Sequence, residues 1–284
     1  MPWKLYVDSR RRVAGSRGDS DSDFAIQLPY PITVSGKCYL DVVLLSNNFW
    51  TIRAGQNDRI YLDELAAQTK RVVTVPPGQY TVYELRDALV TALNIGKAIT
   101  GQYAVTYVDA TNRFQISLVN PVATDQYRVW GETYLKANWS DWSGVTSLSA
   151  NDLKSANRPC GFVGGFISGT NVSNPVAPGA PDVQPYKQLF IRSSLAGGSN
   201  ESLGINGETD IVRRIVVGNT PVNGMIHDVH NQAFDCITIN GKPEISQPVG
   251  GRFFLAWLGR LQTQVPADVS ARLVFIRCGG IRKT

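Results

Sequence analysis

The sequence predicts a mainly β protein: a jelly-roll-like antiparallel β-sandwich that carries an inserted β-α-β-β module. About nine short runs with alternating or continuous apolar residues are separated by Gly, Pro and Asn, which favours strands joined by turns. Only one stretch, residues 81–95, has the spacing of an amphipathic helix over several turns. Because strand patterns lie on both sides of this helix, we interpret it as part of a module inserted into the sandwich.

The strands are predicted from short runs rich in β-branched and aromatic residues. Two of them, Val42–Leu45 and Leu273–Arg277, are apolar at successive positions, as expected for inner strands covered on both faces. The predicted strands are Leu5–Val7, Phe24–Leu28, Lys37–Leu45, Arg59–Leu62, Gln188–Arg192, Ile211–Val217, Ile237–Ile239, Arg252–Leu258 and Ala271–Arg277.

The helix prediction rests on several independent signals. Thr81 and Glu84 have the Thr-x-x-Glu spacing of a capping box, and Gly96 supplies a stop. The apolar side chains at three- and four-residue spacing form one stripe. They are Val82, Leu85, Leu89, Ala92 and Leu93. Two alternating runs follow, at Tyr103–Val108 and Arg113–Leu118, and predict a hairpin that covers this stripe.

The expected domains are a sandwich formed by residues 1–66 and 166–284, and an inserted module formed by residues 67–165. Residues 120–187 carry few regular patterns, although a helical turn is expected near Ser149–Ser155. Thr170–Gln184 is rich in Pro and is predicted to be an extended loop or arm. Ser9–Asp23 is rich in polar turn formers and is the second candidate arm.

The charge, the cysteines and the lengths of the apolar runs limit the classes of protein to which this chain is expected to belong. Charged residues make up 18% of the 284 residues, and the net charge of +5 is too small to indicate a nucleic-acid partner by itself. The four cysteines, Cys38, Cys160, Cys236 and Cys278, form no Cys-x-x-Cys pair, so reduced, buried thiols are predicted. No apolar run approaches the length of a membrane span, and the N-terminus lacks the apolar core of a signal peptide.

Catalytic motifs are sparse, and we predict a non-enzymatic protein without a cofactor. His227 and His230 are the only histidines, and their spacing offers two metal ligands without a third at a known spacing. They are therefore weak candidates for a metal site, and a surface loop is the simpler interpretation. The chain has neither a Gly-x-Ser-x-Gly elbow nor a phosphate-binding Gly loop.

Three features are candidates for binding a partner: an Arg-Gly-Asp tripeptide, the basic ends of the chain, and a cluster of aromatic residues. Arg17, Gly18 and Asp19 form a tripeptide that a receptor of the integrin class recognises, and also one that commonly fills a flexible turn. Basic ends are candidates for contact with nucleic acid or for an interior-facing surface of an assembly, and the alternative is a solvated face or a salt-bridge partner. Their residues are Arg10, Arg11, Arg12, Arg282 and Lys283.

A cluster of aromatic residues follows the hairpin. Trp130, Tyr134, Trp139 and Trp142 lie in a polar stretch. They are candidates for a sugar-binding or partner surface, and the alternative is that they cover the helical module as part of its core.

Several segments resemble structural proteins of Polinton-like viruses, virophages and large eukaryotic double-stranded DNA viruses. They are Tyr6–Gly15, Asp23–Leu28, Cys38–Trp50, Val73–Leu85, Pro159–Phe162 and Leu189–Leu195. The resemblance is weak in residues 120–155 and 170–187. The family's Arg-Asp-Arg pattern is replaced here by Arg10-Arg-Arg12, so an ion-pair role of the middle position does not carry over.

The resemblance implies a virion location and a minor capsid protein of jelly-roll type, most plausibly a penton subunit at the vertex. Its implied partners are further copies of itself, with a pentamer suggested by the penton resemblance, and the major capsid protein. A spike or fibre is a further partner, and packaged DNA would be reached through the basic termini. The resemblance also implies that the chain is synthesised in the cytoplasm or the nucleus of a host cell. The alternatives are a receptor-binding spike or fibre protein and a β-sandwich metal-dependent enzyme.

Overall fold

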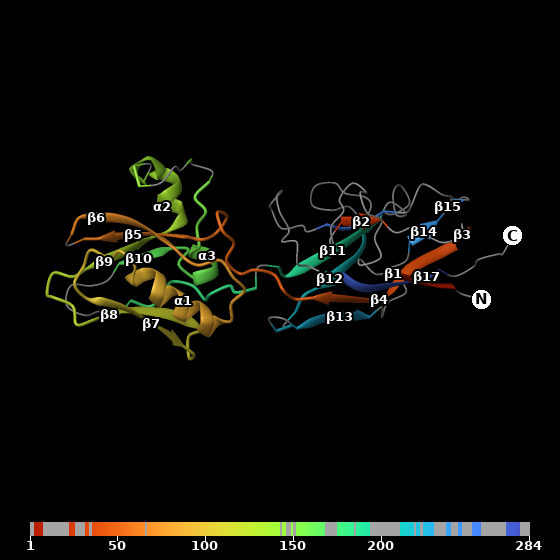
Figure 1. Cartoon of the computed structure of the whole chain (residues 1–284), viewed down its shortest axis with the longest axis horizontal. Coiled ribbons are helices and arrows are strands. Elements are labelled where there is room, and N and C mark those ends of the chain that lie inside the picture. The colour runs from red at the N-terminus through yellow and green to blue at the C-terminus, as the bar shows by residue number, and fades with distance from the viewer. Residues whose placement is uncertain are drawn as a thin grey trace. The chain divides into compact units, whose positions relative to one another are not determined.

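The structure is a computed structural model of the chain, shown in Figure 1. It describes residues 3–7, 23–25, 32–33, 36–65, 67–142, 144–145, 149, 152–167, 175–184, 186–193, 211–218, 220–221, 224–229, 237–239, 244–245, 252–256 and 271–278. The chain divides into two compact units. Unit 1 combines Met1–Phe49 with Tyr186–Thr284, and unit 2 is the continuous segment Trp50–Pro185.

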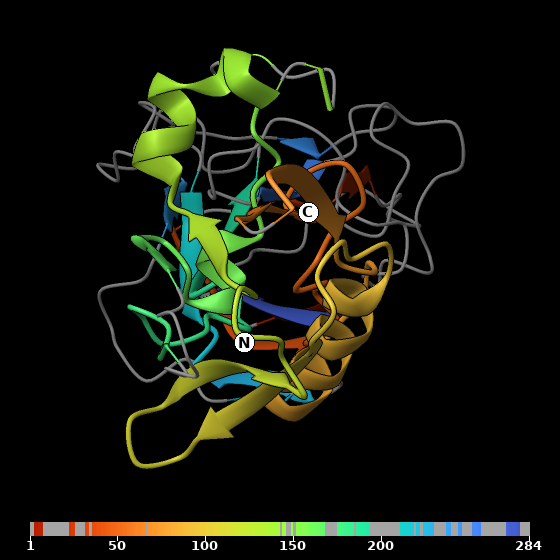
Figure 2. The same cartoon turned by 90° about the vertical axis from the view of Figure 1, so that its left-hand side faces the viewer.

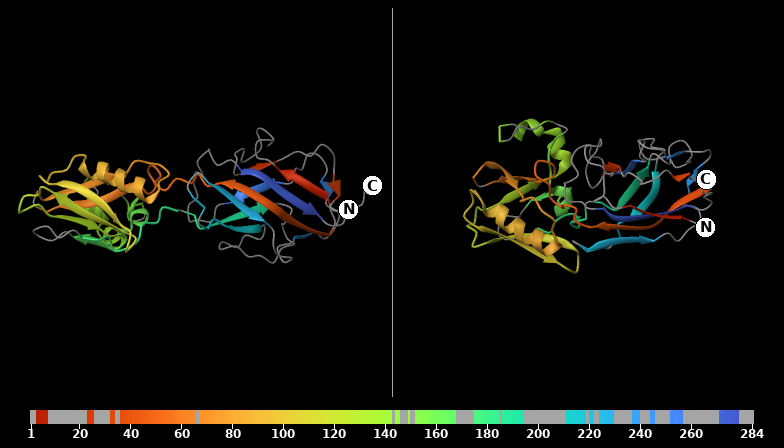
Figure 3. Two further views of the ribbon diagram at one scale, coloured as in Figure 1. Left: turned by 90° about the horizontal axis from the view of Figure 1, so that it is seen from below. Right: turned by 45° about the vertical axis from the view of Figure 1, so that its right-hand side comes forward.

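Unit 1 contains two antiparallel sheets, which confirms the mainly β fold class. The first sheet has the order β1-β17-β4-β13, with β14 also paired to β4, and the second has the order β12-β11-β16-β2. Figure 3 shows β4 and β17 running side by side. The bounds are β1 Trp3–Val7, β2 Asp23–Ala25, β4 Gly36–Ser46, β11 Gln188–Ser193, β12 Ile211–Val216, β13 Met225–Val229, β14 Ile237–Ile239, β16 Arg252–Ala256 and β17 Ala271–Cys278. A short pair, β3 (Ile32–Thr33) and β15 (Glu244–Ile245), stands apart.

The connectivity of these strands is that of a jelly roll. We number the eight principal described strands of the two sheets by chain order, omitting the short β3, β14 and β15. The first sheet then joins the first, eighth, third and sixth strands, and the second joins the fifth, fourth, seventh and second. This order results when four antiparallel strand pairs are wrapped into two facing sheets. The jelly-roll expectation is thus supported by topology as well as by strand content.

A buried arginine joins the two sheets of unit 1. Arg213 on β12 is 7% exposed, and its Nη1 donates a hydrogen bond of 2.8 Å to the carbonyl oxygen of Leu40 on β4. Its Nε also lies 2.5 Å from Oδ2 of Asp228 on β13. Because a buried guanidinium needs an anion and acceptors, these contacts fix the register of one sheet over the other.

Unit 2 is a four-stranded sheet covered on both faces. The strand order is β10-β9-β5-β6, all antiparallel. Helix α1 (Val82–Asn94) and the hairpin of β7 (Gln102–Val108) and β8 (Arg113–Val119) cover one face, as Figures 2 and 3 show. The sheet's strands are β5 Arg59–Glu64, β6 Thr69–Thr74, β9 Tyr127–Trp130 and β10 Gly165–Ile167.

The predicted helix and hairpin are confirmed in detail. Thr81 caps α1 and forms the capping box with Glu84, whose carboxylate accepts the Thr81 backbone N–H at 2.8 Å. These hydrogen bonds to Thr81 lower the pKa of Glu84 below its usual value. The stripe side chains that the structure buries are Leu85, Leu89, Ala92 and Leu93. They pack in one core with Phe114 and Ile116 of the hairpin.

Two expectations about residues 120–187 are corrected. Residues 152–155 are not helical, and short helices lie instead at α2 (Glu132–Ala137), η2 (Trp139–Trp142) and α3 (Asn157–Cys160). Residues 175–184 do not form a free arm, because Ala177 is fully buried and its N–H bonds to the carbonyl oxygen of Phe114 at 2.7 Å. This segment lies along β8 and closes the core of unit 2.

The inserted unit is longer than the expected 67–165. Strand β5 lies before residue 67 and pairs along its length with β6, so both strands belong to unit 2. At the other end, the packed segment 175–184 extends the unit to Pro185. Long-range pairing, which local patterns do not reveal, therefore moves both boundaries outward.

Cys160 agrees with its prediction as a buried, reduced thiol. It is free and fully buried in the core of unit 2, and this burial raises the pKa of its thiol. The side chains of Cys38 and Cys278, and all of Cys236, lie outside the described part. Within that part, no helix is both long and apolar enough to cross a bilayer.

Candidate functional site

Most of the predicted site residues fall outside the described residues. This holds for Arg10, Arg11, Arg12, Arg17, Gly18, Asp19, His230, Arg282 and Lys283. Receptor binding through the Arg-Gly-Asp tripeptide and nucleic-acid contact through the basic ends therefore stay predictions.

His227 lies on a strand rather than on a surface loop. It is in β13, where it is exposed between the exposed side chains of Met225 and Val229. Its neighbour Asp228 is engaged by Arg213. The described residues include no group of three potential metal ligands, and metal binding at His227 and His230 stays a weak prediction.

The aromatic cluster splits into a buried and a partly exposed part. Trp142 is fully buried against Tyr61 of β5, with ring centroids 5.2 Å apart and planes at 80°. Leu135 and Leu153 complete this second core, which lies on the sheet face opposite α1. Burial here raises the pKa of Tyr61 to about 12. Trp142 thus covers the module, and a binding surface that includes Trp142 is excluded.

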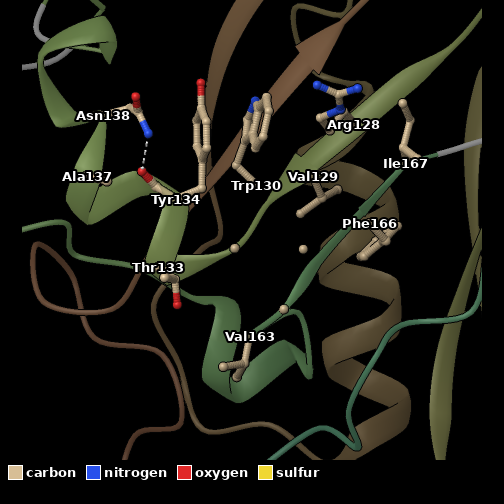
Figure 4. A pocket seen from close by; sticks show the side chains of 13 residues that line it. Arg128, Val129, Trp130, Thr133, Tyr134, Ala137, Asn138, Val163, Phe166 and Ile167 are labelled. Carbon is tan, nitrogen blue, oxygen red and sulfur yellow. Dashed lines mark hydrogen bonds between the residues drawn. The ribbon is translucent and has the colours of Figure 1, made fainter.

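Trp130 and Tyr134 instead border a pocket. It has a volume of about 580 Å³ and lies between β9, α2 and the segment that leads into β10, as Figure 4 shows. Residues of β9 and β10 form one side, and residues of α2 form the other. The lining residues are Arg128, Val129, Trp130, Gly131, Thr133, Tyr134, Ala137, Asn138, Val163, Gly164, Gly165, Phe166 and Ile167.

A stack of three side chains forms the polar side of the pocket. The rings of Trp130 and Tyr134 are stacked, with centroids 3.6 Å apart and planes at 13°. The guanidinium carbon of Arg128 lies 4.7 Å from the Trp130 centroid, and in Figure 4 the tryptophan stands between the other two side chains. Asp63 of β5 fixes the indole by accepting its N–H at 2.8 Å. Both faces of Trp130 are therefore occupied, which leaves no open face for a sugar ring.

Glycines make the opposite side of the pocket possible. Gly165 lies opposite Trp130 in the β9–β10 register, and its φ of +67° favours glycine. A Cβ on Gly165 would lie 2.4 Å from the backbone nitrogen of Gly131. A Cβ on Gly131 would in turn lie 2.6 Å from the carbonyl carbon of Gly164. The chain's own backbone fills the space that side chains would need at Gly131 and Gly165, so the two segments approach closely beside the stack.

The pocket combines one cation with an apolar wall. Arg128 is its only charged lining residue, and the described residues offer it no ion-pair partner. Val163 and Ile167 are 49% and 43% exposed, which is high for aliphatic side chains. An arrangement of this kind suits a ligand that has a negative group next to an apolar one.

Comparison with known proteins gives one structural likeness to report. The chain is similar to the crystal structure of the selenomethionine-labelled mavirus penton protein, at 8% identity and a TM-score of 0.45, over 98% of each chain. No family model and no curated protein sequence matches the chain. At this TM-score and identity, the likeness establishes no shared function.

The pocket was only partly foreseeable from the sequence. The cluster of aromatic residues was visible, but β9 and β10 are 4 and 3 residues long and α2 has 6 residues. Elements this short carry little periodicity. The available signal was the run of glycines at Gly161, Gly164 and Gly165, because repeated glycines often mark a close approach of two backbones.

Proposed function

We propose that the chain is a non-enzymatic structural protein of a virion, a minor capsid or penton subunit that assembles with copies of itself and joins a major capsid protein at the vertex. The observation that carries the proposal is the jelly-roll strand order of unit 1, with unit 2 inserted between its third and fourth strands. Viral capsid proteins commonly use this fold, as do lectins and cupins, so the fold gives an analogy and not a site.

Among the proteins that use this fold, the sequence resemblance favours the viral structural proteins over lectins and cupins. Its segments coincide with structural landmarks: Cys38–Trp50 covers most of β4 and the turn into unit 2, and Val73–Leu85 covers the end of β6 and the capped start of α1. Leu189–Leu195 begins within β11, the first strand after unit 2. Two of these segments border the insertion and one lies inside it, which supports a shared two-unit plan.

An exposed edge strand supports self-association. β13 lies at the edge of its sheet and pairs with β4 along one side. Met225 and Val229 on this strand are 46% and 41% exposed, so this edge presents apolar surface beside a strand that pairs on one side only among the described strands. Burial of such an edge between neighbouring copies is a general way to build a closed ring.

We expect the purified chain to form a discrete oligomer at micromolar concentration, as measured by mass photometry. The double substitution Met225→Glu and Val229→Glu should shift it to monomers, because charges would be buried at the β13 contact without partners. Ile95→Glu is the matched control: Ile95 is 70% exposed but lies at the end of α1 in unit 2, so the oligomer should persist. A native chain that stays monomeric and binds no major capsid protein would contradict the proposal.

A further inference from the structure

We propose that the pocket of unit 2 binds an extended peptide segment of another protein, in which Asp or Glu lies next to an aliphatic or aromatic residue. This inference stands on the pocket alone and does not depend on the virion function. The relevant features are the cation of Arg128, the apolar side chains of Val163 and Ile167, and the edge of β10 that has no strand beside it among the described residues.

The positive charge of Arg128 favours a ligand that carries an acidic group. The guanidinium carbon of Arg128 lies 4.7 Å from the centroid of the Trp130 ring, and this cation–π contact restrains the guanidinium. Arg128 also lies opposite Asp63 in the strand register, but Asp63 Oδ2 accepts the Trp130 N–H and no ion pair joins the two residues among the described contacts. A preorganised guanidinium that lines a pocket is suited to bind a carboxylate through two parallel hydrogen bonds.

The apolar wall selects the neighbouring residue. Ile167 lies opposite Arg128 in the β9–β10 register, so an aliphatic surface borders the cation directly. Val163 extends this surface on the other side of the glycine segment. A ligand side chain placed against Ile167 would remove that exposed aliphatic group from water, which favours an apolar residue next to the acidic one.

The sheet edge selects a polypeptide over a small molecule or a sugar. β10 is the terminal strand of its sheet and pairs with β9 on one side in the described structure, so its other side can accept main-chain hydrogen bonds. A sugar would need an aromatic face, and both faces of Trp130 are covered.

Fluorescence anisotropy with a defined probe set tests the inference. The probes are capped, labelled peptides in which one central Asp is flanked by Val, Leu, Ile or Phe, together with the same peptides carrying Asn instead of Asp. We expect saturable binding of at least one Asp peptide to the full chain, about tenfold tighter than its Asn counterpart, as expected for one charge-assisted hydrogen-bonded contact.

Two variants and a control locate the contact. Arg128→Gln should abolish the preference for Asp over Asn, and Ile167→Glu should weaken both peptides. Lys136→Gln removes the same charge from an exposed position of α2 outside the pocket lining, and should leave the affinity unchanged. Thermal unfolding of each variant checks that unit 2 stays folded.

Three results would overturn the inference. They are no saturable binding by any Asp peptide, equal affinity for the Asp and Asn peptides, and an undiminished Asp preference in a folded Arg128→Gln variant. Saturable binding of an oligosaccharide that is lost in Tyr134→Ala, with no peptide binding, would instead assign the pocket to a glycan.

Discussion

Arg71→Ala is expected to lower the free energy of unfolding of unit 2 by about 3–5 kcal/mol, the cost of removing one partner from a buried ion pair. The Glu64 side chain is fully buried, and its Oε1 lies 3.2 Å from Nη2 of Arg71. Tyr103 donates its hydroxyl to the same oxygen at 3.0 Å, and the N–H of Ala98 bonds to the other. Without Arg71, the carboxylate would remain in the core without a compensating cation.

Arg71 also caps the C-terminus of α1 through its side chain. Its Nη2 donates to the carbonyl oxygen of Leu93 at 2.6 Å, and its Nη1 donates to that of Ile95. These carbonyls lie at the C-terminus of α1, where intrahelical donors are missing and a cation interacts favourably with the helix dipole. Arg71 therefore joins β6, β5 and α1, and its loss affects all three elements.

Urea unfolding followed by circular dichroism measures the loss, with separate transitions fitted for the two units if they appear. The control is Arg86→Ala, because Arg86 lies on α1, whose C-terminus Arg71 contacts, and pairs with the exposed Asp87. We expect a change within about 0.5 kcal/mol. The double variant Arg71→Met and Glu64→Gln should recover part of the stability, since neither charge remains. A single Arg71→Ala change below about 1 kcal/mol would show that the pair does not hold the unit together.

Trp142→Ala is expected to destabilise unit 2 by about 3–5 kcal/mol, as for other fully buried large aromatic side chains. Trp142 fills the second core between β5 and the α2 layer, where it contacts Tyr61 edge-on. Its removal leaves a cavity under η2 and uncovers one face of the sheet. The pocket residues Trp130 and Tyr134 pack against the same core, so the pocket should also lose its shape.

The substitution Trp142→Phe distinguishes the contribution of the ring's volume from that of its buried N–H group. The buried Nε1 of Trp142 donates no hydrogen bond within the described structure, so phenylalanine removes an unsatisfied donor while keeping most of the ring volume. We expect a much smaller loss than for alanine. Tyr83→Ala, at a ring that is 51% exposed, is the surface control. Equal stability of the alanine variant and the native chain in thermal unfolding would contradict the role assigned to this second core.

The parts that the sequence predicted well depend on local rules. The capping box at Thr81, the apolar stripe of α1 and the alternation in β7 and β8 each operate within a few residues, and all are observed. The long strands β4 and β17 were also visible, because continuous apolar runs are characteristic of inner strands.

The parts that were missed depend on contacts between distant residues. The sequence predicts a surface loop around His227, and the structure has strand β13 there, in which Asp228 pairs with Arg213 of the other sheet. β10 is a strand because β9 lies beside it, although Gly165 and two further residues carry no period. The pocket required β9, β10 and α2 together, so only the aromatic residues hinted at it.

The protein composition of virus particles tests the central claim most directly. Under the proposed virion role, we expect mass spectrometry of washed virus particles from cells that produce this chain to find it in a fixed ratio, well below that of the major capsid protein. Antibodies against unit 2 should label intact particles at their vertices. A chain that is abundant in infected cells but absent from purified particles would contradict a structural role in the virion.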